Sequence, residues 1–213
     1  MTTAYLLLLL MTTISCTSVA LTKKFQVSAR PEAENYLQAN ICAGVLSCVF
    51  LFLASGCKPL RLSEATICCA LALGFLSTIS VFITVYVYSK TSLALALIVS
   101  SAGSIVVPIL FGLCFNGEQP SIRLIISAVL ILVAAILPFA KRGMFKDSGK
   151  FLWILILFFF FNGATGIVSK VYAQTEGASD TSSYLILTNV FVIIFSLVCA
   201  LFILLRKKKA LSG

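Results

Sequence analysis

The sequence contains no histidine and few acidic residues, with seven Asp and Glu against sixteen Lys and Arg in 213 residues. Charged residues make up only 11% of the chain, whereas a soluble domain carries about 25%. Without imidazole and without any Cys-x-x-Cys spacing, the chain lacks the usual zinc-ligand patterns. It also shows no nucleophile paired with a base and no phosphate-binding loop. We therefore predict that the protein is not an enzyme and has no catalytic residues, no metal and no other cofactor.

Apolar residues are what the sequence has in abundance, at 60% of the chain with a mean hydropathy of +1.09. One protein core cannot bury that many, and the charges are too few to cover a soluble surface. The composition therefore argues against a soluble, disordered or nucleic-acid-binding protein. The net charge of +9 could suggest nucleic acid, but in a membrane protein Lys and Arg are enriched in cytoplasmic loops. The surplus must face lipid, so the first expected partner is the lipid bilayer.

The apolar residues fall into runs long enough to cross a membrane, which requires about 20 residues at 1.5 Å rise. The runs cover approximately residues 4–22, 37–56, 65–88, 92–114, 122–140, 151–171 and 184–205. Because they show no two-residue alternation, we predict an all-α polytopic membrane protein with about seven transmembrane helices. Lysines follow rather than precede the first run, which favours a retained helix over a signal peptide. Most of the eight cysteines lie in these runs and are expected to be small buried residues.

The basic residues predict an orientation. Twelve Lys and Arg lie in the segments after the first, third, fifth and seventh runs, against four on the opposite side. Because cytoplasmic loops are enriched in Lys and Arg, we expect the N-terminus outside and the Lys-rich C-terminus in the cytoplasm. The expected location is the inner or plasma membrane.

The chain contains an internal repeat. Residues 15–25 and 162–172 both run from small polar residues into a Thr/Ser-Lys-x-aromatic pattern, with an offset of 147. Tyr36-Leu37 and Tyr184-Leu185 match at nearly the same offset. Residues 1–142 are therefore expected to form a five-helix repeat, and residues 150–213 the first two helices of a second, inverted one. An odd number of helices per repeat inverts the second copy, as in many secondary transporters. On this offset the chain corresponds to about seven helices of a ten-helix protein.

Three stretches carry a family resemblance: Tyr86–Ala94, Ser100–Pro108 and Phe115–Pro120. They resemble the short connection, the Pro-bearing fourth helix and the Gly-Glu turn of EamA-type proteins in the drug/metabolite transporter superfamily. The resemblance implies a membrane transporter of a small-molecule substrate, without identifying that substrate. Members usually have ten helices and many have a cytoplasmic N-terminus, so the chain departs from the pattern in both respects. The first run also lacks the carboxylate that related small multidrug exchangers use for proton coupling.

Candidate pathway residues are polar, small or helix-breaking groups inside the runs. They are Asn162, Gly163, Thr165, Ser100, Ser101, Gly103, Ser104, Pro108, Thr13 and Ser15. A buried amide such as Asn162 must be paired, so it either lines the pathway or bonds another helix. Gly103 and Pro108 favour either a kinked or unwound helix that offers backbone groups, or close packing of small residues. The hydroxyls of the first run either line a cavity or bond their own helix.

Several other features have structural explanations. Residues 158–161 form a Phe run, favoured for packing or lipid contact over a substrate platform. Glu118 is expected to cap the next helix or pair with Arg123, and Lys170 to anchor at the interface or bind an anionic group. The predicted function is secondary transport of a small organic solute, drug or metabolite by alternating access, without ATP. The alternatives are a truncated or non-transporting subunit completed by a partner, such as a homodimer, and a seven-helix receptor.

Overall fold

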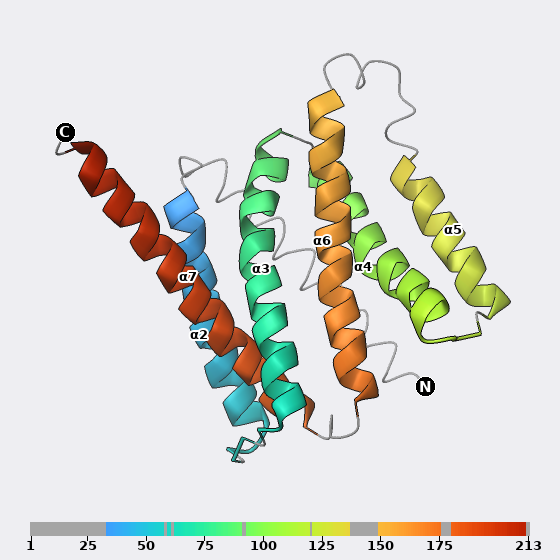
Figure 1. Ribbon diagram of the computed structural model, residues 1–213, viewed down its shortest axis with the longest axis horizontal. Coiled ribbons are helices and arrows are strands. Elements are labelled where there is room, and N and C mark those ends of the chain that lie inside the picture. The colour runs from blue at the N-terminus through green and yellow to red at the C-terminus, as the bar shows by residue number, and fades with distance from the viewer. Residues whose placement is uncertain are drawn as a thin grey trace.

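The computed structural model describes residues 33–57, 59–60, 62–90, 93–119, 121–136, 149–175 and 180–211, and within them it is all-helical (Figure 1). The helices are α2 (Ala33–Ala54), α3 (Glu64–Lys90), α4 (Leu93–Phe115), α5 (Ile122–Ile136), α6 (Gly149–Gln174) and α7 (Thr181–Leu211). Each coincides with a predicted apolar run, so a helix is confirmed at six of the seven runs. The run at 4–22, with Thr13 and Ser15, lies outside the described residues.

Five of these helices are long and apolar enough to cross a membrane. The spans are Tyr36–Ala54, Glu64–Lys90, Leu95–Phe115, Leu152–Gln174 and Thr181–Leu205. The described part of α5 is shorter, at 15 residues. The fold is that of a helical membrane protein.

The outer surface of the bundle is strongly apolar, while some small polar residues are buried inside it. Many large apolar side chains point outward, and Leu46, Phe50 and Trp153 are each at least 70% exposed. Small hydroxyl residues are instead buried between helices, with Thr78 at 3% and Ser196 at 0%. In water such an apolar surface would be unfavourable, whereas lipid matches it and small residues let helices approach closely.

The helices alternate in direction, so the C-terminal ends of α2, α4 and α6 lie at the same end of the bundle as the N-terminal ends of α3, α5 and α7 (Figure 1). Helix α6 packs against α4 and α3, and α7 packs against α2 and α3. Helix α3 therefore lies between two helix pairs, α4–α6 and α2–α7.

The α4–α6 pair is parallel and held close by glycines. Ser100 contacts Asn162 and Pro108 contacts Lys170, each pair 62 positions apart, which fixes the parallel direction. A methyl group on Gly103 would lie 2.2 Å from the Phe159 carbonyl oxygen. Glycine is therefore required here, because any side chain would separate the two backbones.

Helix α4 is continuous through Pro108, so the unwound turn considered from the sequence is not observed. Proline has no N–H to donate to the Ser104 carbonyl one turn earlier. A methyl group on Gly166 would lie 3.1 Å from that oxygen and 2.6 Å from Pro108 Cγ. The bare backbone of Gly166 on α6 therefore lies against both the proline ring and the Ser104 carbonyl, where a side chain would not fit.

The α2–α7 pair is antiparallel. Asn40 Nδ2 donates to Ser196 Oγ at 3.2 Å, and Cys48 Sγ lies 3.7 Å from the Ile186 carbonyl oxygen. Between these contacts, a methyl group on Gly44 would lie 2.8 Å from Ile193 Cγ1. The two helices thus approach most closely where α2 has a glycine.

The expectation that the cysteines are buried is wrong for several of them. Cys42, Cys68 and Cys114 are free thiols exposed on the helices. A thiol is apolar enough to face lipid, so apolar position alone does not distinguish the outer surface from the interior.

Candidate functional site

A partly open cavity of about 680 Å³ lies between α2, α3 and α6. Its lining is contributed by Tyr36, Ala39, Asn40 and Ala43 of α2, by Leu73, Ser77, Ser80, Val81, Thr84 and Val85 of α3, and by Asn162, Thr165 and Ser169 of α6. On each helix these residues recur every three or four positions, which places them on one face. Three otherwise apolar helices therefore turn their polar faces towards one space.

The α6 side of the cavity is fixed by hydrogen bonds. Asn162 Oδ1 accepts from Ser100 Oγ of α4 at 3.0 Å, and Asn162 Nδ2 donates to the Phe158 carbonyl at 2.8 Å. Thr165 Oγ1 donates to the Asn162 carbonyl at 2.7 Å, and Ser169 Oγ donates to the Thr165 carbonyl at 3.0 Å. Each of these side chains keeps free acceptor capacity, and the Asn162 amide keeps one N–H.

The α3 side contributes Ser77, Ser80 and Thr84, whose hydroxyls have no hydrogen-bond partner among the described residues. Thr78 of the same helix lies outside this lining, is buried, and bonds the Gly74 carbonyl at 2.9 Å. Serine and threonine in membrane helices commonly bond their own backbone in this way. The cavity-facing hydroxyls therefore differ from the packed one in being available to a ligand.

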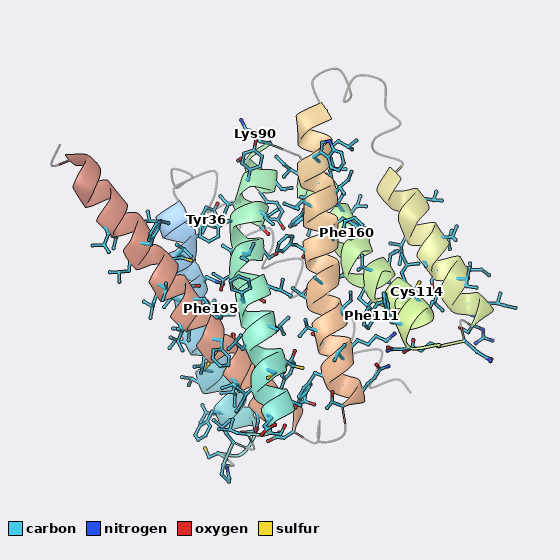
Figure 2. The ribbon with its side chains drawn as sticks, viewed as in Figure 1. Tyr36, Lys90, Phe111, Cys114, Phe160 and Phe195 are labelled. Atoms are coloured by element: carbon cyan, nitrogen blue, oxygen red, sulfur yellow. The ribbon has the colours of Figure 1, made fainter. Side chains whose placement is uncertain are left out.

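The α2 side carries the amide of Asn40 and the ring of Tyr36, which is 8% exposed and lies at the start of the helix (Figure 2). The Asn40 Nδ2–Ser196 Oγ hydrogen bond fixes the amide against α7. This leaves the Asn40 carbonyl oxygen as an acceptor.

The cavity lies between two apolar clusters along α3 and α6. At one end Ala70 packs with Tyr172 and Tyr184, whose rings stack at 3.8 Å between centroids, and the lining residue Leu73 contacts this cluster. At the other end Val87 packs with Phe158 and with residues of α4. Aromatic and aliphatic side chains thus close both ends of the α3–α6 contact.

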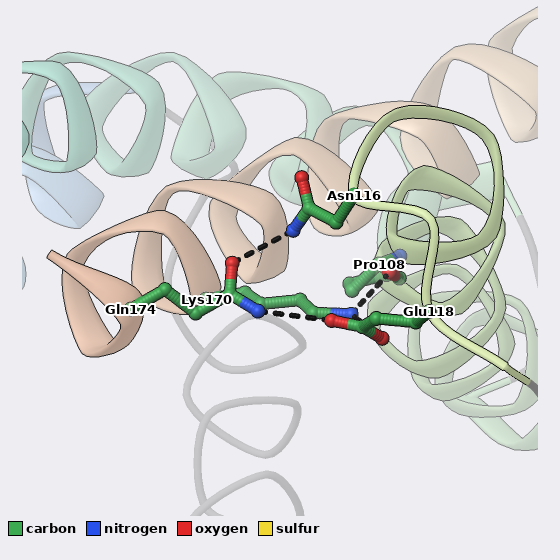
Figure 3. Close-up of polar contacts among 5 residues, drawn as sticks. All are labelled: Pro108, Asn116, Glu118, Lys170 and Gln174. Atoms are coloured by element: carbon green, nitrogen blue, oxygen red, sulfur yellow. Dashed lines mark hydrogen bonds and ion pairs between the residues drawn. The ribbon is translucent and has the colours of Figure 1, made fainter.

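A separate polar cluster joins the ends of α4 and α6 (Figure 3). Lys170 Nζ lies 2.7 Å from Glu118 Oε2 and donates to the Pro108 carbonyl at 3.3 Å. Gln174 donates to Glu118 Oε1 at 2.9 Å and accepts from Asn116 Nδ2 at 2.7 Å. The cation that pairs with Glu118 is therefore Lys170. The prediction that Glu118 pairs with Arg123 is wrong.

Two glycines explain this pairing. Gly117 has φ of 61°, which lets the chain turn back after α4. A methyl group on Gly112 would lie 2.1 Å from Lys170 Nζ and 2.4 Å from Glu118 Oε2, so its absence leaves room for the ion pair. The hydrogen bond from Lys170 lowers the pKa of the Glu118 carboxyl below its ordinary value, since it stabilises the charged form.

The structure brings only part of the predicted pathway to the cavity. Asn162 and Thr165 line it, and Ser100 lies behind Asn162 in contact with its amide. Gly103, Gly163 and Pro108 lie in the α4–α6 contact, where a methyl group on Gly163 would meet Val107 Cβ at 2.3 Å. Ser101 and Ser104 are exposed on α4. In the Phe run, Phe158 is buried in a cluster while Phe160 is 57% exposed (Figure 2).

Sequence analysis missed Ser77, Ser80 and Thr84. The available signal was their spacing of three and four positions within one apolar run, which predicts a polar stripe on one helix face.

Chemically, the described lining offers hydroxyl and amide groups together with apolar side chains, which suits reversible binding of a small molecule. Compared with known proteins, the chain matches no family model, no curated protein and no solved structure.

Proposed function

We propose that this protein is a secondary transporter of the drug/metabolite, EamA-like type that moves a small organic solute by alternating access. The observation that carries the proposal is the polar cavity between three apolar helices. Polar groups within a membrane helix are unfavourable unless they are paired or line a hydrated space. Several hydroxyls and amides facing one such space are typical of a solute pathway.

The α2–α7 contact supports the inverted repeat on which this type of transporter is built. A two-fold axis between equivalent helices requires them to cross at residues separated by the repeat offset. Gly44 approaches Ile193 and the Asn189 carbonyl, which are 149 and 145 positions further along the chain. These values bracket the offset of 147 found between the two sequence stretches. The position of this contact therefore supports the proposed repeat.

The two apolar clusters supply candidate gates. Opening the Ala70–Tyr172–Tyr184 cluster would expose the cavity at one end, and opening the Val87–Phe158 cluster would expose it at the other. Alternating access requires that only one gate opens at a time. With the charge-based orientation in the inner or plasma membrane, the tyrosine gate and the Glu118–Lys170 pair would lie on the extracytoplasmic side.

A flux measurement tests the proposal. The full chain is reconstituted into liposomes loaded with a mixture of small organic solutes, and mass spectrometry follows which solutes leave. We expect saturable efflux of at least one solute that protein-free liposomes retain. The variant Asn162→Ala should reduce this efflux by about tenfold at equal reconstituted amount, since it removes a lining amide and its bond to Ser100.

The matched control is Ser89→Ala. Its hydroxyl is exposed near the end of α3 and bonds the Tyr86 carbonyl, away from the cavity. This variant should retain the wild-type efflux rate. Efflux no faster than from protein-free liposomes for every solute, or equal loss in the two variants, contradicts the proposal.

A further inference from the structure

We propose that the cavity binds an uncharged solute carrying several hydroxyl groups, of the polyol, sugar or nucleoside class. This inference rests on the proposed function, in that it names the class of substrate taken by the same site. It depends on three properties of the described lining: its lack of charge, its distribution of donors and acceptors, and its apolar walls.

The first property is charge. No acidic or basic side chain is among the cavity-lining residues that the structure describes. Lys170 follows the lining residue Ser169, but it points to α4, where Glu118 neutralises it at 2.7 Å. An ion entering a site without an opposite charge loses its hydration with little in return. The site therefore disfavours cations, anions and zwitterions.

The second property is the hydrogen-bonding pattern. On α6, Thr165 and Ser169 already donate their protons to backbone carbonyls, so they offer the cavity only acceptors. On α3, Ser77, Ser80 and Thr84 have no partner within the described residues and can both donate and accept. A solute that satisfies both walls must itself carry donors and acceptors close together. Hydroxyl groups have this property.

The third property is shape. Between the polar groups lie the small side chains of Ala39 and Ala43 and the aliphatic ones of Val81 and Val85. These apolar side chains would contact the carbon skeleton of a solute rather than its hydrogen-bonding groups. The volume of about 680 Å³ is within the range of about 300–1,000 Å³ typical of small-molecule sites. Such a site suits a ring or chain that is apolar on one face and hydroxylated on the other.

The test combines binding and flux on the purified full chain. Binding is measured as ligand-dependent stabilisation against heat, and flux in liposomes. The uncharged probes are ribitol, glucose and uridine. The charged probes are glutamate, choline and the zwitterion alanine. We expect stabilisation and saturable flux with at least one uncharged probe and with none of the charged ones.

Variants connect the result to the site. Ser80→Ala and Thr84→Val should each weaken binding of the effective probe by about 2- to 12-fold, the range expected for one lost hydrogen bond. Ser89→Ala should leave binding unchanged, because its hydroxyl lies away from the cavity. Should a variant fail to fold, the charge preference of the unmodified protein still decides the inference.

The outcomes separate the two proposals. Flux of charged probes alone overturns the substrate class while supporting a transporter. Stabilisation by an uncharged probe that never crosses the membrane supports the binding class and overturns transport. Neither stabilisation nor flux with any uncharged probe overturns the inference.

Discussion

The tight contact between α4 and α6 can be tested at Gly103. The substitution Gly103→Ala places a methyl group 2.2 Å from the Phe159 carbonyl oxygen and 2.9 Å from its carbonyl carbon. Ordinary van der Waals contact begins near 3.4 Å. Because both obstacles are backbone atoms, no side chain can rotate away, and the two helices must separate by roughly 1 Å.

The size of the effect follows from two terms. Forcing an extra methyl group into a packed contact costs about 1–3 kcal/mol. Separating the helices also stretches the 3.0 Å bond between Ser100 and Asn162, which is worth about 0.5–1.5 kcal/mol. Together these terms lower the free energy of unfolding by about 1.5–4.5 kcal/mol, and the better helix propensity of Ala offsets about 1 kcal/mol of that loss.

Gly112→Ala is the matched control, because it makes the same change in the same helix. Its methyl group would lie 2.1 Å from Lys170 Nζ and 2.4 Å from Glu118 Oε2, both at the ends of flexible side chains. These ends can move at the cost of weakening a partly exposed ion pair, which contributes little because solvent screens it. The gain in helix propensity from Gly to Ala is common to both variants and cancels.

The assay is unfolding in mixed detergent micelles of increasing SDS content, followed by loss of helical circular dichroism. Gly103→Ala should unfold at clearly lower SDS content than Gly112→Ala. If both variants unfold together, or if Gly112→Ala is the less stable, the argument from backbone contact is refuted.

Two further substitutions test the polar contacts. The lowered pKa of Glu118 means that its pairing with Lys170 stabilises the protein above the ordinary value of 4.5 and is lost as the pH falls through the lowered pKa. The melting temperature should therefore be lower in Glu118→Gln than in the wild type at neutral pH, and the difference should vanish in acid; a difference that persists in acid contradicts this. Ser196→Val removes the acceptor for Asn40 Nδ2 and should lower the free energy of unfolding by about 1–3 kcal/mol, whereas Ser89→Ala should not. Equal SDS sensitivity of those two variants would show that the bond between α2 and α7 contributes nothing.

The sequence predicted the helices better than their partners. An apolar run of about 20 residues defines a span without reference to its neighbours, so the bounds of α3 and α4 agree with the predicted runs. The partner of Glu118 could not be found in this way, because it depends on the turn at Gly117 and on α6 lying beside α4. Closeness in the sequence favoured Arg123 as the partner of Glu118, whereas the fold brings Lys170 to this carboxylate.

The same distinction explains the candidate site. Asn162 could be selected from the sequence because an amide inside an apolar run needs a partner wherever it points. The spacing of Ser80 and Thr84 indicates a polar stripe, but it does not show what the stripe faces, because a hydroxyl can bond its own helix and its function depends on the helix rotation. Gly163 was selected as a pathway residue, yet rotation by one position from Asn162 places it against Val107 of α4.

Neighbouring residues of α6 face different sides, so this helix connects the cavity with the α4–α6 contact. Residues 162, 165 and 169 face the cavity, whereas residues 159, 163, 166 and 170 face α4. Asn162 takes part in both, since it lines the cavity while Ser100 of α4 donates to it. Backbone contact at Gly103 and the ion pair at Lys170 hold α4 and α6 together along their length. In the proposed transport cycle, these two helices would therefore move as one body against α2 and α7. A solute bound in the cavity at Asn162 would therefore act on the α4–α6 body and on α2 and α7 at once.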